Sequence, residues 1–317
     1  MWLFFIYTRP YSDLIPPVRE CSWQIDTLAR HHWICGNPLG AGGQVGINST
    51  EYPPNASVEQ ADTSSITSQR RMIATPVLSF ADVQMTFPDG TEAVQNITFD
   101  VAPKEFVTIV GPSGCGKSTL LRIAAGLLPQ TAGTVTVNRE RLGFVFQDAT
   151  LMEWRTVQRN VELLAELRGL SAKERKARAA EAIALVGLSG FENHYPKSLS
   201  GGMKMRVSLA RTLTLEPPIF LFDEPFGALD EITRERLNEE TLKLFMREEF
   251  AGLFITHSIS EAVFLSTRVH VMSARPGRII ATFDVPFEYP RDAELRFAPD
   301  FRELSREISH ALLEGHS

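Results

Sequence analysis

Residues 105–118 read Glu-Phe-Val-Thr-Ile-Val-Gly-Pro-Ser-Gly-Cys-Gly-Lys-Ser, a short apolar run that ends at a glycine-rich loop. The loop matches the pattern Gly-x-x-x-x-Gly-Lys-Ser/Thr, and residues 118–128 have helical spacing. Strand, glycine loop and helix in this order are the context of a phosphate-binding loop, because the glycines let backbone N–H groups converge on phosphate oxygens at the positive end of the helix. The stretch therefore predicts an α/β nucleotide-binding core.

The last residues of this loop carry the predicted chemistry. The Lys117 side chain is expected to reach the β and γ phosphates of a nucleotide, and the Ser118 hydroxyl is expected to ligate Mg²⁺. Cys115 occupies a free position of the pattern, and we interpret it as a small filler rather than a redox sensor. The predicted nucleotide-binding residues here are Gly111, Pro112, Ser113, Gly114, Cys115, Gly116, Lys117, Ser118 and Thr119.

An acidic pair follows a second apolar run. Residues 219–222 read Ile-Phe-Leu-Phe, which suits a strand buried on both faces of a parallel sheet. Asp223 and Glu224 come directly after it, at the end of the strand where ligands bind in open α/β sheets. Asp223 is predicted to hold Mg²⁺ through water, and Glu224 to orient and deprotonate an attacking water.

Residues 199–203, Leu-Ser-Gly-Gly-Met, lie between the loop and the acidic pair. They open a helix that is predicted to end near residue 214. Ser200 then stands at the helix N-terminus, where its hydroxyl and the Gly201 and Gly202 amides would point at a phosphate. The glycine-rich loop already surrounds the phosphates from one side, so this segment needs a separate explanation.

Together these motifs resemble those of the nucleotide-binding subunits of ABC transporters, from about Pro76 to the C-terminus. Residues 199–202 resemble the signature motif of that family. Several such elements in the right order are far more specific than any one of them. The further matching elements are Gln147 of the Q-loop, Asp230 of the D-loop, His257 as the switch histidine and Phe87 as the aromatic residue that stacks on adenine.

The resemblance implies an ATPase that uses ATP and Mg²⁺ and works as a head-to-tail dimer of two copies of the chain. In that family the signature of one subunit, here residues 200–202, closes over the ATP held by the other. The resemblance further implies that His257 contacts the γ phosphate and positions the water with Glu224. It implies that Gln147 contacts Mg²⁺ and senses the transmembrane partner.

Softer patterns point to a subfamily. Residues 151–157 with residues 160–161, and Arg-Pro-Gly-Arg at residues 275–278, resemble the importers for nitrate, sulfonate, taurine and similar small solutes. This implies a separate permease, indirectly a solute-binding protein, and a peripheral position on the cytoplasmic face of the cell membrane. Two features depart from the subfamily pattern: Glu153 stands where many relatives have Pro, and Met-Lys-Met fills residues 203–205.

The bulk composition limits the other possibilities. The 317 residues are 44% hydrophobic and 22% charged, and a net charge of −6 gives no general electrostatic reason to expect nucleic acid as a partner. The apolar run at residues 1–7 is shorter than the roughly 20 residues of a membrane span. Cys21, Cys35 and Cys115 are far apart and odd in number, which argues against a disulfide framework or a zinc site and fits a reducing compartment.

Strands and helices alternate along the chain, which predicts an α/β fold with a mostly parallel sheet. The resemblance implies a P-loop NTPase fold of the ABC type, with an antiparallel β subdomain and an all-α subdomain inserted at about residues 149–215. Strand 97–101 belongs to the former, and helix 157–167 to the latter. A C-terminal helix is predicted at about residues 300–314, with Asp300 as its cap. One face of this helix carries Phe301, Leu304, Ile308 and Leu312.

Residues 1–75 differ from the rest, because scattered Pro, Gly, Ser and Asn interrupt any sustained period of 2 or 3.6. We expect a poorly ordered N-terminal extension there and an ABC ATP-binding domain at residues 76–317. A partner-docking arm, or a true start at Met72, are the open alternatives.

The alternative function is a soluble ABC ATPase that acts on DNA or ribosomes. Those that act on DNA carry long coiled coils or zinc modules between loop and signature, whereas residues 118–199 are compact and contain no cysteine. Ribosome-acting forms usually carry two nucleotide domains, and this chain has one of each motif. A P-loop kinase would leave residues 199–202 unexplained. The transporter subunit is therefore favoured.

Overall fold

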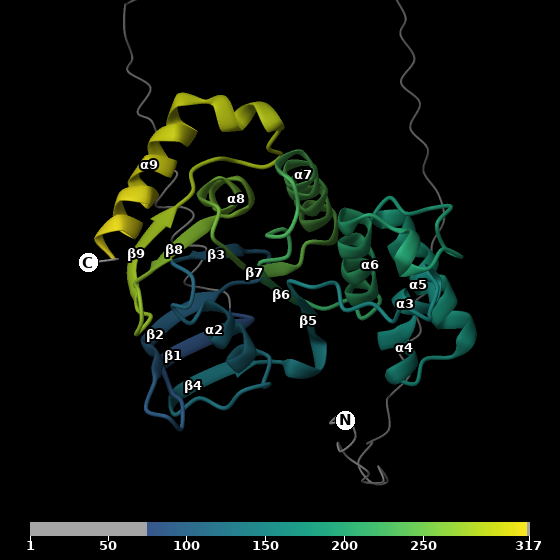
Figure 1. The fold of residues 1–317 in the computed structure, drawn as a ribbon, viewed down its shortest axis with the longest axis horizontal. Coiled ribbons are helices and arrows are strands. Elements are labelled where there is room, and N and C mark those ends of the chain that lie inside the picture. Colours follow the sequence, from purple (N-terminus) through teal and green to yellow (C-terminus); the bar gives the residue numbers. More distant parts are fainter. Residues whose placement is uncertain (1–74, 316–317) are drawn as a thin grey trace, which may run out of the picture. The chain divides into compact units, whose positions relative to one another are not determined.

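A six-stranded sheet lies at the centre of the structure, a computed structural model that describes residues 75–315 (Figure 1). Its strands lie in the order β5-β6-β7-β3-β8-β9, and all are parallel except β9, which is antiparallel to β8. Every residue of β3, β6, β7 and β8 is buried, as expected for a parallel sheet covered on both faces. The strands are β3 (Phe106–Val110), β5 (Leu142–Val145), β6 (Ile219–Asp223), β7 (Ala251–Thr256), β8 (Arg268–Met272) and β9 (Ile279–Asp284).

A smaller antiparallel sheet has the order β2-β1-β4, which confirms the predicted antiparallel part of the fold. Its strands are β1 (Leu78–Thr86), β2 (Glu92–Val101) and β4 (Ala132–Val137). β2 begins well before the predicted start at residue 97. The register of its pairing with β1 shifts near Val94, so Ala93 and Val94 are consecutive yet both buried. This broken alternation conceals the first half of the strand in the sequence.

The residues of β3 alternate between two hydrophobic cores. Phe106 and Val110 pack into the core that contains the inner faces of α7, α8 and α9. Val107 and Ile109 pack into the core shared with α2 and the antiparallel sheet. The two sets of elements accordingly lie on opposite faces of the six-stranded sheet (Figure 1). The helices are α2 (Lys117–Ala124), α7 (Glu231–Glu248), α8 (Ile259–Leu265) and α9 (Pro299–Glu314).

The inserted helical segment stands beside the β5 edge of the sheet, in teal in Figure 1. Its helices are α3 (Val157–Val161), α4 (Leu163–Leu167), α5 (Ala172–Leu185) and α6 (Gly201–Leu213), and short 3-10 turns are η1 (Arg139–Arg141), η2 (Pro196–Ser198) and η3 (Ala293–Phe297). The helix predicted over residues 157–167 is divided at Glu162 into α3 and α4. Glu162 keeps helical angles, and its amide donates to the Gln158 carbonyl at 2.9 Å, so helical hydrogen bonding continues across the division.

The C-terminal helix α9 begins differently from the prediction. Ala298 occupies the N-cap position without a side-chain cap, and Pro299 opens the helix. Proline suits this position because its missing N–H would have no partner there. Asp300 is instead an acidic residue of the first turn, where its charge favours the helix dipole. Phe301 and Ile308 are buried on the predicted apolar face.

The predicted extension, residues 1–75, lies outside the described residues except for Thr75. Within residues 75–315, no helix combines the length and the apolar character needed to cross a membrane.

Candidate active site

Three adjacent strands bring the predicted chemistry to one edge of the sheet. β7 pairs with both β3 and β6, and all three run in parallel, so their C-terminal ends lie together. The P-loop, residues 111–118, follows β3, the acidic pair ends β6, and His257 follows β7. This is the edge at which open α/β sheets bind ligands.

The P-loop holds Lys117 over its own backbone. The buried Lys117 Nζ donates hydrogen bonds to the carbonyl oxygens of Gly111 and Pro112, at 2.8 and 3.0 Å. Gly116 adopts φ 103°, and a Cβ on it would lie 2.6 Å from the Ala93 carbonyl oxygen. Only glycine therefore fits this position, and the close approach of β2 explains why the pattern requires it.

Ser118 and Asp223, both predicted to hold Mg²⁺, lie in direct contact. The Ser118 hydroxyl donates to Asp223 Oδ1 at 2.6 Å. Burial raises the pKa of the Asp223 carboxyl above its ordinary value, and the Ser118 hydrogen bond opposes that shift. Two oxygen atoms of the kind that Mg²⁺ prefers therefore lie side by side at the start of α2.

The Glu224 carboxylate lies between Lys117 and His257. Its Oε1 is 3.7 Å from Lys117 Nζ, and its Oε2 is 3.1 Å from His257 Nδ1. Glu224 adopts φ 45°, a left-handed conformation that costs a non-glycine residue of order 1–3 kcal/mol. The backbone amide of Glu224 donates to the Ile255 carbonyl at 3.0 Å, which holds the residue against β7. A carboxylate held between a lysine and a histidine at a phosphate loop can position a water for attack and accept its proton.

The other predicted site residues lie further apart. Ser200 caps α6, accepting from the Met203 amide at 3.3 Å, and within residues 75–315 no hydrogen bond joins residues 200–202 to the P-loop. Asp230 caps α7, and the Thr233 backbone amide it binds lowers the pKa of its carboxyl. Gln147 is exposed just beyond β5, at the same edge of the sheet as the acidic pair.

Phe87 lies in the turn that follows β1. Its backbone amide donates to the Thr91 carbonyl at 2.9 Å, and its half-buried ring packs against the core of the antiparallel sheet.

Arg275 is a residue that the sequence analysis did not assign to the site. Its Nε and Nη2 both donate to the Gly114 carbonyl oxygen, at 3.1 and 2.9 Å. The Gly277 amide in the same loop donates to Ala93 at 3.0 Å, so residues 275–278 connect the P-loop to β2. The signal was present, because this loop follows β8, which pairs in parallel with β3 and must end beside the P-loop.

Comparison with known proteins places this geometry in a family. The family model described as "ABC transporter" matches residues 94–227. A taurine import ATP-binding protein of Rhizobium johnstonii is 43% identical, over 68% of this chain and 87% of the relative. The nitrate import ATP-binding protein of a Synechocystis species is 44% identical, over 70% and 88%. An aliphatic sulfonates import ATP-binding protein of Bacillus cereus is 40% identical, over 75% and 96%.

The chain belongs to the ABC transporter family. Among solved structures, a dimeric ABC cassette in a post-hydrolysis state, bound to ADP and phosphate, is 32% identical. The match has a TM-score of 0.59 and covers 67% of this chain and all of that one. The predicted ABC-type P-loop fold is thus confirmed. The chain is an ABC ATP-binding subunit that hydrolyses ATP.

Proposed function

We propose that the chain powers an ABC importer of a small anionic or organic solute of the nitrate, sulfonate or taurine type. It would pair head to tail with a second copy, bind a separate permease at the cytoplasmic face of the membrane and serve a solute-binding protein indirectly. The names of the relatives at 40–44% identity support the solute class. The ATP-binding domain of this proposal is residues 76–317, and residues 1–75 are an extension outside it.

The single observation that carries the catalytic part is the position of the Glu224 carboxylate. One oxygen faces Lys117 and the other faces His257, at 3.7 and 3.1 Å. Lys117 would bind the β and γ phosphates, and Glu224 would take the proton of the attacking water. His257 would contact the γ phosphate and hold that water against Glu224.

The donor set at Ser118 and Asp223 fits Mg²⁺. This cation prefers oxygen ligands and keeps several waters, so it needs only one or two protein ligands beside the substrate phosphates. The Ser118 hydroxyl would ligate the ion directly, and the Asp223 carboxylate, 2.6 Å from that hydroxyl, would hold it through water, with Gln147 as a further ligand from the β5 end. The ion would neutralise charge that develops on the phosphates.

The placement of residues 200–202 supports a composite site. Ser200 and Gly201 are exposed at the N-terminus of α6, with the amides of a positive helix end. The P-loop lies elsewhere, so these amides are free to face the ATP of a partner subunit. The dimeric ABC cassette among the structural relatives supports this arrangement. Asp230, exposed at the start of α7, would lie in the same interface.

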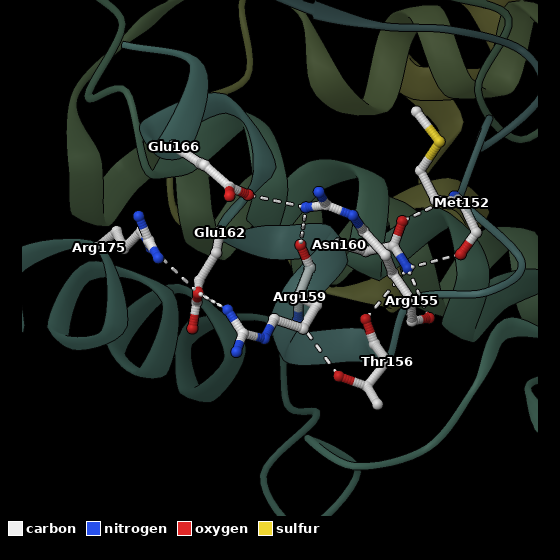
Figure 2. A network of polar contacts seen from close by, with 8 residues as sticks. All are labelled: Met152, Arg155, Thr156, Arg159, Asn160, Glu162, Glu166 and Arg175. Atoms are coloured by element: carbon white, nitrogen blue, oxygen red, sulfur yellow. Dashed lines mark hydrogen bonds and ion pairs between the residues drawn. The ribbon is translucent and has the colours of Figure 1, made fainter. Parts of the chain in front are cut away.

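The surface proposed for the permease lies on the inserted helices, near Gln147. Trp154 is 75% exposed in the loop that precedes α3. Figure 2 shows how that loop is held: Asn160 reaches back to Met152 and Thr156, while Glu166 engages Arg155. An exposed aromatic ring on a braced loop suits a protein interface. Glu153 beside it brings a charge to that interface.

Glu224→Gln tests the catalytic assignment. We expect ATP binding to persist and turnover to fall by roughly 10²–10⁴, because the amide cannot accept the proton. Glu181→Gln, an exposed change on α5, is the matched control and should keep the wild-type rate. Wild-type hydrolysis by Glu224→Gln would show that another group is the base.

Two variants mixed together test the composite site. A Ser200→Arg chain keeps its P-loop, and a Lys117→Ala chain keeps its signature, so each alone should be inactive. Their mixture should recover activity, since a heterodimer contains one site with both elements intact. A mixture as inactive as its components would contradict the head-to-tail arrangement.

A further inference from the structure

We propose that Arg234 and Glu261 form a positioning pair that couples the D-loop to the switch-histidine loop. The D-loop here is residues 226–230, and the switch loop is residues 256–258. The inference rests on the proposed function, because that function gives the two loops their roles. Neither side chain belongs to the predicted site, and neither is expected to touch ATP.

Arg234 binds the backbone of the D-loop. It lies in the first turns of α7, directly after the loop, and its side chain is 19% exposed. Its Nη2 donates to the Leu229 carbonyl at 2.9 Å, and its Nε donates to the Phe226 carbonyl at 3.4 Å. One guanidinium therefore spans the D-loop backbone. Charge-assisted bonds of this kind to backbone carbonyls are stronger than neutral ones.

Glu261 holds the switch loop in the same way. It lies on α8 with a side chain that is 6% exposed. Its Oε2 accepts a hydrogen bond from the Thr256 hydroxyl, and the Thr256 Oγ1 accepts from the Ser258 amide at 3.0 Å. The Ser258 hydroxyl in turn accepts from the Glu261 amide at 3.3 Å. Both residues that flank His257 are thus tied to Glu261.

The side chains of Arg234 and Glu261 approach each other in the interior of the protein. Glu261 Oε1 lies 3.9 Å from Arg234 Nε, within ion-pair distance, while Arg234 Nη1 binds the exposed Glu231 carboxylate at 2.9 Å. Burial raises the pKa of Glu261, while Arg234 and the Thr256 hydrogen bond oppose that shift. The pair therefore joins the D-loop carbonyls on one side to the Thr256 hydroxyl on the other through one chain of polar contacts.

The coupled loops surround the catalytic carboxylate. A Cβ on Gly227 would lie 3.5 Å from His257 Cε1 and 3.7 Å from Glu224 Oε2, so the D-loop backbone is close to both side chains. A shift between the loops would change the 3.1 Å contact between Glu224 and His257. Because the D-loop would face the partner subunit, closure of the dimer would move the D-loop. The Arg234–Glu261 pair would transmit that movement to the switch histidine, His257. Removing the pair should slow hydrolysis without weakening ATP binding.

The test compares Glu261→Gln, Arg234→Gln and Arg234→Lys with wild type in steady-state ATP hydrolysis. We expect kcat to fall at least tenfold in the two glutamine variants while KM for ATP stays within twofold. Arg234→Lys should recover part of kcat, because lysine keeps the charge beside Glu261. The control is Arg236→Gln on the same helix, an exposed arginine that pairs with Glu240, and it should match wild type.

Thr256→Val is a second variant that tests the proposal if the substitutions at Arg234 or Glu261 prevent folding. It removes the hydroxyl that Glu261 accepts from while keeping the side-chain volume, and it should lower kcat in the same direction. Thermal unfolding of every variant identifies those that are folded at the assay temperature. Folded variants with wild-type kcat, or with a raised KM and an unchanged kcat, would overturn the pair as a positioning device.

Glu224→Gln, assayed in parallel, distinguishes failure of the Arg234–Glu261 proposal from failure of the proposed catalytic site. If Glu224→Gln is inactive and the Arg234 and Glu261 variants match wild type, only the positioning pair is wrong. If Glu224→Gln hydrolyses ATP at the wild-type rate, the proposed site itself is wrong.

Discussion

Asn160 allows a sharp test of how the loop that carries Trp154 is held. The residue is fully buried in α3. Its Nδ2 donates to the carbonyls of Met152, Arg155 and Thr156 at 2.9–3.1 Å, and its Oδ1 accepts from the Met152 amide at 2.8 Å. One side chain therefore satisfies both ends of the loop that carries Trp154.

Asn160→Ala should lower the free energy of unfolding by about 2–4 kcal/mol. Each hydrogen bond contributes about 0.5–1.5 kcal/mol net, and a buried amide left without a partner costs about 1–3 kcal/mol. Urea denaturation measures the difference. Asn193→Ala, at an exposed asparagine in the same helical segment, should stay within about 0.5 kcal/mol of wild type.

Asn160→Asp should destabilise the fold more than alanine at pH 8, although aspartate has the same shape. Its carboxylate would face the carbonyl oxygens that Nδ2 now binds, which repel the charge and raise the pKa of the new group in the folded state. The folded chain then binds more protons than the unfolded one, so stability relative to wild type should rise as the pH falls. Urea curves at pH 5 and pH 8 measure this. An aspartate variant as stable as wild type at pH 8, or one insensitive to pH, would refute the reasoning.

Four further predictions concern the site. Lys117→Ala should weaken ATP binding more than tenfold by titration calorimetry, about 1.4 kcal/mol, and unchanged affinity would count against the P-loop assignment. Gly116→Ala should lower Tm, because φ 103° and the Ala93 carbonyl leave no room for a methyl group; an unchanged Tm would contradict this. Asp223→Asn should raise Tm at pH 7 without metal or nucleotide, because it removes a buried negative charge. This gain in Tm should shrink as the pH falls through the raised pKa of folded Asp223, since protonation then removes the same charge from the wild-type protein. A gain in Tm that does not change with pH would argue against a buried charge. Arg275→Ala should raise KM for ATP several-fold, whereas Arg278→Ala, whose partner is Gln95, should not; equal effects would remove the specific role of Arg275.

Much of the fold can be predicted from short apolar runs of sequence and from the residues that follow them. Residues 106–110 and 219–223 are apolar strands whose C-terminal ends carry the P-loop and the acidic pair. Parallel pairing brings such ends to one edge, so the sequence is sufficient to expect that Lys117, Asp223 and Glu224 lie close together. Local chemistry also explains the start of α5, where the Ser171 hydroxyl caps the helix by accepting from the Glu174 amide.

Contacts between distant residues could not be read from such patterns. Arg275 reaches Gly114, and Arg234 approaches Glu261, across long stretches of sequence. The order of the strands indicates which loops lie beside the P-loop, but not which carbonyl an arginine binds. A guanidinium that binds a backbone carbonyl needs no particular residue type at the other end. The Asp300 cap failed for a local reason: Pro299 fits the first helical position and moved the helix start ahead of it.

The left-handed backbone at Glu224 has a consequence for how the chain tolerates substitution. Glycine takes this conformation without steric cost, so Glu224→Gly would relax the backbone while deleting the carboxylate. A screen for thermal resistance alone would therefore favour loss of the acid, and a screen for turnover would restore it. Stability and hydrolysis make opposite demands on this one position, so a stabilised variant of the chain should be sequenced at residue 224 before its activity is assumed.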